Sequence, residues 1–265
     1  MQQQAMKQSS QWQQSGRSVV LRYLLLSFLL LPSILLLLLL LRRGKFTEGT
    51  ATATGTAMTV AVGDDLRIRP GYPTYDAYIQ RQLNKTLNPK LRQIWTTRDW
   101  GRKVRVFSGF FDSLKREGIL SNSSKALCVG ARVGQEVAAL RSVGVNDSIG
   151  IDLVPYPPLV VEGDFHRQPF PDATFDFEFS NVFDHALYPD RFVGEIERTL
   201  KPGGVCVLHV ALSRRADKYS ANDLFSVKPL VALFKRSDVV DVRKVDGFGL
   251  DTEVVFRKKQ LIRHR

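Results

Sequence analysis

Along the second half of the chain, hydrophobic residues follow two alternating patterns. Short apolar runs of strand length lie at 125–129, 147–153, 159–161, 175–180 and 205–212. Between some of these runs, at 134–143 and 191–200, apolar residues recur every three or four positions, which predicts helices. Strands that alternate with helices predict a parallel sheet with right-handed crossovers, which is the α/β class.

The chain closes with two further predicted strands, at 238–245 and 252–257, separated by a Gly-Phe-Gly turn at 247–249. This connection is too short for a helical crossover, so the two strands should pair antiparallel. A Lys-Pro-Gly-Gly sequence at 201–204 should end the preceding helix, and another helix is expected around 222–235. The expected fold is therefore Rossmann-like, with a seven-stranded, mostly parallel sheet and an antiparallel C-terminal hairpin.

Ahead of this α/β core, assigned to 121–258, aromatic and aliphatic residues recur at helical spacing. The pattern predicts helices within 74–120, as a lead-in that packs on the core. Together with a basic tail at 259–265, these segments form one expected domain over 74–265.

A long apolar segment precedes that domain. Residues 23–41 contain no charge, and 13 of these 19 residues are Leu. As a helix they would extend roughly 28 Å, close to the thickness of a bilayer core. A cleaved signal peptide would be shorter, so we expect a single N-terminal transmembrane helix. The Gln-rich segment 1–22 is expected to be disordered, and 42–73 to form a flexible stalk.

The distribution of charge changes what the net charge of +12 means. Residues 1–47 and 256–265 hold eleven basic residues and no acidic one, which leaves the rest of the chain close to neutral. A neutral body predicts no nucleic-acid partner, and basic residues beside an apolar span suit anionic lipid.

Basic residues flank both ends of the apolar span, so the positive-inside rule does not decide its orientation. Three glycosylation sequons, at Asn84, Asn122 and Asn146, favour a lumenal body. We therefore expect an endomembrane protein of the Golgi or endoplasmic reticulum, with another organelle membrane as the alternative. The oligomeric state stays open.

Candidate chemistry lies at the carboxyl ends of the predicted strands, where open α/β sheets bind ligands. Gly130 and Gly134 bracket the turn between the first strand and its helix, where glycine lets a ligand approach the backbone. Asp152 ends the second strand, at the spacing of an acid that binds the two ribose hydroxyls of a nucleoside cofactor. The alternative is an ordinary turn with a capping Asp.

Two further groups of residues follow the third and fourth strands. Asp164 can accept a hydrogen bond from an exocyclic amino group, and Phe165 can stack on a purine; a polar turn explains them equally well. Asn181 comes directly after the fourth strand. Next to it, His185 is the candidate general base and Asp184 the residue that would orient it. The alternative for His185 is a structural role.

The remaining histidines and the cysteines do not suggest a metal centre. No two His residues have metal-ligand spacing with a carboxylate, so we expect no metal. Cys128 and Cys206 lie in predicted strands and are interpreted as small hydrophobic residues.

At this point the chain resembles the class I S-adenosylmethionine-dependent methyltransferases, in particular the small-molecule, type 11-like group and its plant membrane-anchored members. The resemblance covers about 95–258. It depends on the glycine turn at 126–137, on the order of motifs through 149–204, and on the terminal hairpin.

The resemblance implies a Rossmann-like methyltransferase fold, S-adenosyl-L-methionine as cofactor, and roles for residues at matching positions. Gly130, Ala131 and Gly134 would flank the methionine part, and Asp152 would hold the ribose. Leu153, Asp164 and Phe165 would contact the adenine, and Asn181 would lie near the transferred methyl group. Two positions depart from the family pattern: Cys128 replaces an acid, and Arg132 replaces the middle glycine of the turn.

The leading hypothesis is therefore a membrane-anchored methyltransferase that acts on a small-molecule or glycan-type acceptor. Cys128 and Arg132 motivate the alternative, a catalytically inactive methyltransferase-fold scaffold at a membrane. A nicotinamide dinucleotide enzyme ranks last, because the glycine turn lacks the Gly-x-Gly-x-x-Gly pattern.

Overall fold

The computed structural model describes residues 65–212 and 217–260. The chain divides into two units, 1–59 and 60–265, and the described residues all belong to the second. The predicted transmembrane helix at 23–41 and the segment 1–22 lie outside the described residues. Within the described part, no helix combines the length and the hydrophobicity that crossing a bilayer requires.

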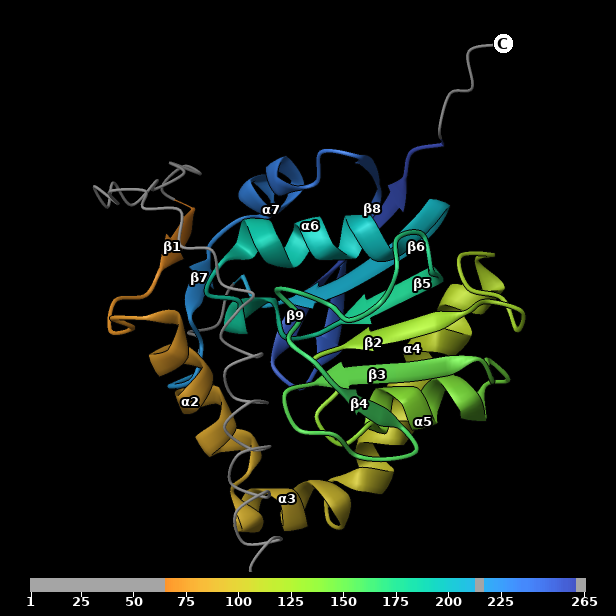
Figure 1. Ribbon diagram of the computed structural model, residues 1–265. Coiled ribbons are helices and arrows are strands. Elements are labelled where there is room, and N and C mark those ends of the chain that lie inside the picture. The colour runs from red at the N-terminus through yellow and green to blue at the C-terminus, as the bar shows by residue number, and fades with distance from the viewer. Residues whose placement is uncertain (1–64, 213–216, 261–265) are drawn as a thin grey trace, which may run out of the picture. The chain divides into compact units, whose positions relative to one another are not determined.

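A seven-stranded sheet forms the centre of the domain (Figure 1). In spatial order its strands are β4 (Val160–Glu162), β3 (Ser148–Asp152), β2 (Ala126–Val129), β5 (Phe175–Ser180), β6 (Leu200–Val210), β9 (Leu250–Lys258) and β8 (Ser237–Gly247). The first five strands are parallel, whereas β9 pairs antiparallel with both β6 and β8. This arrangement confirms the predicted Rossmann-like sheet with its antiparallel hairpin.

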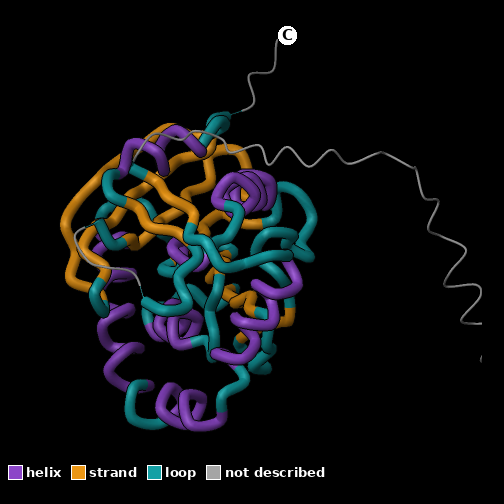
Figure 2. Tube along the Cα trace, turned by 90° about the vertical axis from the view of Figure 1, so that its left-hand side faces the viewer, coloured by secondary structure: helices purple, strands orange, loops and turns teal. Residues whose placement is uncertain are grey.

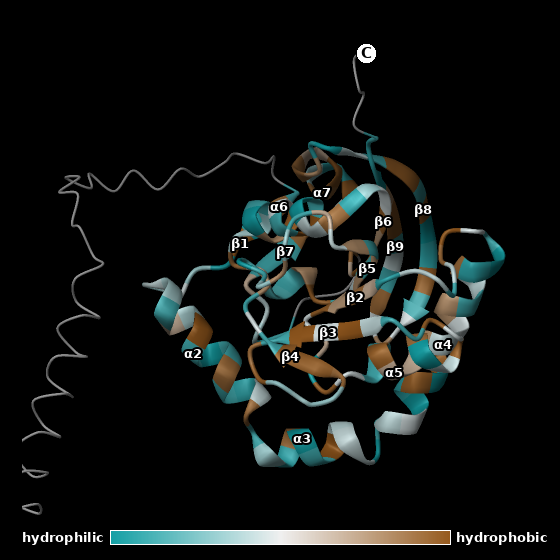
Figure 3. Cartoon of the chain, turned by 45° about the vertical axis from the view of Figure 1, so that its right-hand side comes forward, coloured by the Kyte–Doolittle hydropathy of each residue, from teal (hydrophilic) through white to brown (hydrophobic). Residues whose placement is uncertain are grey.

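Helices cover both faces of the sheet and form two hydrophobic cores. The helices α4 (Trp100–Arg116) and α5 (Gln135–Ser142) pack on one face, where Phe107 and Phe111 meet the phenylalanines of β5. The helices α6 (Pro189–Thr199) and α7 (Val227–Leu233) pack on the other face. Figure 3 shows that β3 and β4 are mostly hydrophobic, as expected for strands covered on both sides.

The lead-in contains three helices: α2 (Tyr75–Thr86), α3 (Pro89–Thr96) and α4. The side chain of Thr74 caps α2 by accepting a hydrogen bond from the amide of Ala77, and Asn88 caps α3 in the same way. In Figure 1 the arrowheads of the central strands point towards α2, so this helix lies at their carboxyl ends. Figure 2 looks onto that end of the sheet, where the loops gather.

The structure differs from the sequence prediction in two places. Residues 222–235 do not form one helix, because they begin with β7 (Asn222–Leu224), which pairs antiparallel with β1 (Leu66–Ile68). The expected stalk over 42–73 therefore does not reach residue 73, since β1 belongs to the folded domain. A three-residue strand whose partner lies near the other end of the chain leaves no periodic pattern in the sequence.

Candidate functional site

A cavity lies where the strand order reverses, because β2 pairs with β3 on one side and with β5 on the other. This is the place where open α/β sheets bind their ligands. Of the ten candidate site residues, the cavity is lined by Gly130, Asp152, Leu153, Asp164, Phe165 and His185. The other four, Ala131, Gly134, Asn181 and Asp184, lie outside its lining.

The two glycines of the β2–α5 turn have different tasks. Gly130 has a φ of +75°, and a Cβ at this position would lie 2.3 Å from Cγ2 of Val182, which follows β5. Gly134 has a φ of +82°, and a Cβ there would lie 2.6 Å from the Cβ of Leu159, away from the cavity. Only Gly130 therefore brings backbone to the cavity, whereas Gly134 allows α5 to pack against the segment before β4.

Asp152, the predicted ribose-binding residue, ends β3 and lines the cavity. One of its carboxylate oxygens, Oδ2, accepts a hydrogen bond of 2.9 Å from the amide of Arg132. Burial raises the pKa of Asp152, and the amides of Arg132, Leu153 and Val154 oppose that shift. The carboxylate is thus fixed in direction by the backbone while still lining the cavity, which is the geometry needed to accept hydroxyl donors.

Asp164 is placed differently, because its carboxylate is already occupied within the chain. It accepts hydrogen bonds from the Tyr75 hydroxyl and from the amide of His166, the latter at 2.8 Å. Burial acts to raise the pKa of Asp164, but the hydrogen bonds from His166 and Tyr75 outweigh it and lower the pKa. The predicted contact of Asp164 with an adenine amine would have to share these oxygens, whereas the Phe165 ring lines the cavity directly.

His185 reaches the cavity from η1 (Phe183–His185), a short turn after β5. Its Nδ1 lies 3.1 Å from the carbonyl oxygen of Tyr219. A carbonyl can only accept, so Nδ1 carries the proton and Nε2 is left with its lone pair. Burial lowers the pKa of His185 and outweighs the charge of Asp184, which opposes the shift, while the charge of Lys85 adds to it, so the ring stays neutral.

The predicted pairing of His185 with Asp184 is wrong as an orienting contact. The nearest approach is 4.0 Å, between Oδ2 of Asp184 and Nε2, the nitrogen that faces away from Tyr219. Asp184 instead accepts a hydrogen bond from the Ser220 hydroxyl. Adjacent residues on a tight turn point their side chains in different directions, so the orienting group is the Tyr219 carbonyl.

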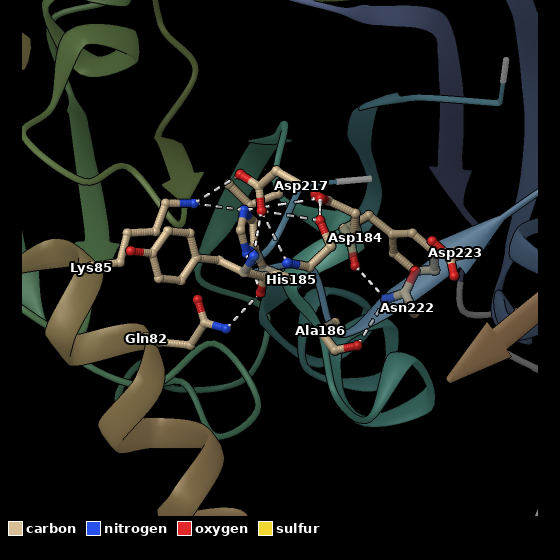
Figure 4. Close-up of polar contacts among 12 residues, drawn as sticks. Gln82, Lys85, Asp184, His185, Ala186, Asp217, Asn222 and Asp223 are labelled. Carbon is tan, nitrogen blue, oxygen red and sulfur yellow. Dashed lines mark hydrogen bonds and ion pairs between the residues drawn. The ribbon is translucent and has the colours of Figure 1, made fainter. Parts of the chain in front are cut away.

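Helix α2 contributes side chains to the site that were not predicted from the sequence. Tyr78, Gln82, Lys85 and Thr86 all line the cavity, and Figure 4 shows Lys85 directed from this helix towards His185. The Nζ atom of Lys85 lies 3.2 Å from Nε2 of His185, and burial lowers the pKa of this lysine. The available signal was polar residues spaced four apart at 78, 82 and 86, on the buried face of the helix.

Asn181 lies just outside the cavity and contacts the first turn of α5. Its Nδ2 donates a hydrogen bond of 3.1 Å to Oε1 of Glu136. Glu136 is buried, and its second oxygen, Oε2, has no hydrogen-bond partner within the described domain. This carboxylate beside the glycine turn was not among the residues predicted from the sequence.

Arg132 and Cys128, the two departures from the family pattern, are both accommodated. Arg132 has a φ of +55°, and its guanidinium lies 4.5 Å from the ring centre of Trp95 on α3. This cation–π contact fixes the direction of the side chain, which also lines the cavity. Cys128 is buried within β2, and burial raises the pKa of its thiol, so it is neither a nucleophile nor an acid there.

Among residues 65–212 and 217–260, no group of three potential metal-ligating side chains comes together. His209 instead pairs with Glu253 on the neighbouring strand, where β6 and β9 lie side by side. The distance between Nε2 of His209 and Oε2 of Glu253 is 2.7 Å.

Comparison with known proteins agrees with this geometry. Residues 127–208 match the family model of a methyltransferase domain. A methyltransferase of Burkholderia thailandensis that acts on 1,6-didemethyltoxoflavin, solved with that compound and S-adenosylhomocysteine, has a similar fold. The TM-score is 0.55 and the identity 19%, over 74% of this chain and 93% of that one.

Two other solved structures are also similar to this chain. A chain from a Haloferax volcanii complex that contains the methyltransferase activator Trm112 gives a TM-score of 0.51 at 19% identity, over 65% of this chain and 97% of that one. A SAM-dependent methyltransferase from Aquifex aeolicus gives 0.45 at 20% identity, over 56% and 88%. The match to the methyltransferase domain and the shared fold together support the predicted class of protein, an S-adenosylmethionine-dependent methyltransferase.

Proposed function

We propose that the chain is a membrane-anchored methyltransferase that transfers the methyl group of S-adenosylmethionine to a small-molecule or glycan-type acceptor. The observation that carries this proposal is the cavity at the switch point, into which Gly130, Asp152 and Phe165 converge from three strand ends. The methyltransferase-domain match over 127–208 supports the same conclusion.

These residues fit the donor in chemistry as well as in place. The Asp152 carboxylate is held by the backbone and suits the paired hydroxyls of a ribose. Leu153 and Phe165 offer apolar surface to a purine. Gly130 has no side chain, so it lines the cavity with backbone alone and the donor's chain can pass close to it.

S-adenosylmethionine supplies a methyl group on a positively charged sulfur, which is reactive enough to need little activation. The protein's main task is then to hold the acceptor in line with that methyl group. Where the acceptor is protonated, His185 can take the proton at Nε2, because its Nδ1–H is fixed on the Tyr219 carbonyl. The acceptor would replace Lys85 as the donor to Nε2.

The anchor and the compartment are part of the same proposal. The apolar segment 23–41 motivates a membrane-bound protein of the Golgi or endoplasmic reticulum. The three sequon asparagines, Asn84, Asn122 and Asn146, are all exposed on the folded domain, as glycosylation would require. Expression in a eukaryotic host, followed by glycosidase digestion, should shift the wild-type chain and not the triple Asn→Gln variant. An unshifted wild-type chain would contradict the lumenal placement.

The activity can be tested without knowing the acceptor. Full-length protein is incubated with donor labelled on the methyl carbon and with fractionated small molecules from a membrane-rich extract. We expect label in at least one fraction with the wild type and none with Asp152→Ala. Label that appears equally with both proteins would show that the cavity at the switch point is not the active site.

A further inference from the structure

Glu136 is a buried residue, and one oxygen of its carboxylate lacks a hydrogen-bond donor within the described domain. The residue is 6% exposed, its Oε1 accepts from Nδ2 of Asn181 at 3.1 Å, and its Oε2 has no partner within the described domain. Leaving a buried charged oxygen without a donor is costly, and such atoms in native proteins commonly belong to a binding function. The question is therefore which donor completes this site.

The groups around Glu136 in the described domain do not supply that donor. Lys103, on the neighbouring helix α4, is close enough for the Glu136 charge to act on it, yet Oε2 is without a bond to it. Burial lowers the pKa of Lys103 to about 8, with the charge of Arg132 adding to the effect and that of Glu136 opposing it. Cys128 also feels the Glu136 charge, but its thiol is buried within β2.

Glu136 lies just outside the cavity lining, next to residues that belong to it. It lies in the first turn of α5, directly after the turn that carries Gly130 and Gly134. Its partner Asn181 directly follows β5, and the next residue, Val182, lines the cavity and faces Gly130. The carboxylate thus lies between the two strand ends that define the switch point.

Because the ligand must bring a donor to a buried carboxylate oxygen, a compact cation is the best chemical fit. If the proposed function holds, the donor molecule carries such a cation, the α-ammonium group of its methionine part. We infer that Glu136 binds this α-ammonium through Oε2, with Asn181 holding the carboxylate in position.

A pair of ligands separates this contact from the rest of the site. S-adenosylhomocysteine carries the α-ammonium, whereas 5′-methylthioadenosine has the same nucleoside and lacks the amino-acid part. Titration calorimetry on the full-length chain should show that Glu136→Gln weakens S-adenosylhomocysteine binding by about 10- to 100-fold, the range for a charge-assisted hydrogen bond. The affinity for 5′-methylthioadenosine should stay within about twofold, because the nucleoside does not reach Glu136.

The matched control is Glu178→Gln, which makes the same change at another buried glutamate with an unpartnered Oε2, in the middle of β5. It should leave the affinity for both ligands unchanged. If Glu136→Gln does not fold, the wild type still tests the inference: it should bind S-adenosylhomocysteine at least about tenfold more tightly than its desamino analogue.

Three other outcomes would each overturn the inference. Equal affinity of wild type and Glu136→Gln for S-adenosylhomocysteine overturns the inference and leaves the proposed function in place. A loss for S-adenosylmethionine alone would place the sulfonium at Glu136, and also overturns it. If the wild type binds none of these ligands, including 5′-methylthioadenosine, the proposed function falls and the inference with it.

Discussion

Glu136 and Glu178 are both buried glutamates with one satisfied oxygen and one unpartnered oxygen, but they lie in different regions of the described domain. Glu178 lies in the sheet interior, where Thr199 donates to Oε1 at 2.6 Å. Burial raises its pKa to about 8, so the neutral acid is stable there at pH 7. Glu136 lies beside the glycine turn at the switch point.

A buried carboxylate oxygen without a hydrogen-bond partner therefore has a different explanation in each of the two regions. In the sheet interior, protonation removes the charge and no ligand is needed. Next to the cavity, Asn181 holds the carboxylate and is followed in the chain by Val182, which lines the cavity, so a ligand can complete Glu136. The site side chains should therefore respond to ligands, and the interior glutamate to pH alone.

The largest difference between the two regions should appear in catalysis. His185→Gln keeps the size of the side chain but removes the base, and we expect methyl transfer to a protonated acceptor to fall by about 10²- to 10⁴-fold. Because burial lowers the pKa of His185 from 6.5, wild-type activity should hold through neutral pH and decline only below that value. Label transfer to the extract fraction at several pH values measures both effects. Unchanged activity in the variant would assign His185 a structural role.

The next largest effect should be on nucleoside binding. Asp152→Ala removes the carboxylate that faces the cavity, and we expect the Kd of 5′-methylthioadenosine and of S-adenosylmethionine to rise by about 100-fold. Both ligands should lose affinity, in contrast to Glu136→Gln. Exposed Glu162, at the end of neighbouring β4, provides the control as Glu162→Gln. A loss for S-adenosylmethionine alone would place the ribose elsewhere.

For the interior region the expected effect is on stability. The pKa of Glu178 rises from 4.5 to about 8 on folding, so the folded state binds more protons between these values. Its contribution is fully present below pH 4.5 and is lost as pH rises through 8, by at most about 1.4 kcal/mol per pH unit. Glu178→Gln should reduce the fall in unfolding free energy between about pH 5 and about pH 8. Parallel curves for the two proteins in denaturant titrations would contradict the protonated state.

The smallest effect should come from Arg132→Gly. Glycine removes the steric strain of a side chain at φ +55°, which should stabilise the fold by about 1 kcal/mol. The variant also loses the cation–π contact with Trp95, which should destabilise the fold by about 0.5–1 kcal/mol. The free energy of unfolding should change by less than about 1 kcal/mol. Affinity for S-adenosylmethionine should stay within about threefold, since the guanidinium is held on the Trp95 ring, which does not line the cavity. A large gain in affinity would show that Arg132 obstructs the cavity.

Much of the fold could be predicted from the sequence because its main strands and helices carry strong periodic patterns. The strand at 175–180 and the closing hairpin are examples. The strand is a short apolar run, and the hairpin is two apolar runs separated by a clear turn signal. The pairing of β1 with β7 could not be predicted, because three-residue strands far apart in the chain have no local pattern.

The site was predictable only where a residue's position along a strand decides its role. Asp152 and Gly130 were found because both follow directly from the ends of strands. Lys85 and Glu136 were missed, since tertiary packing of helices brings them to the site. The partner of His185 was also unpredictable, because a backbone carbonyl from residue 219 has no signature in the sequence.

The central claim is that the cavity between the ends of β2, β3 and β5 binds S-adenosylmethionine. Titration calorimetry of the full-length, folded wild-type chain with this compound tests it most directly. The account predicts saturable binding of one molecule per chain, which Asp152→Ala weakens by about 100-fold. The absence of heat at high micromolar ligand, with unfolding curves showing folded protein, would contradict it.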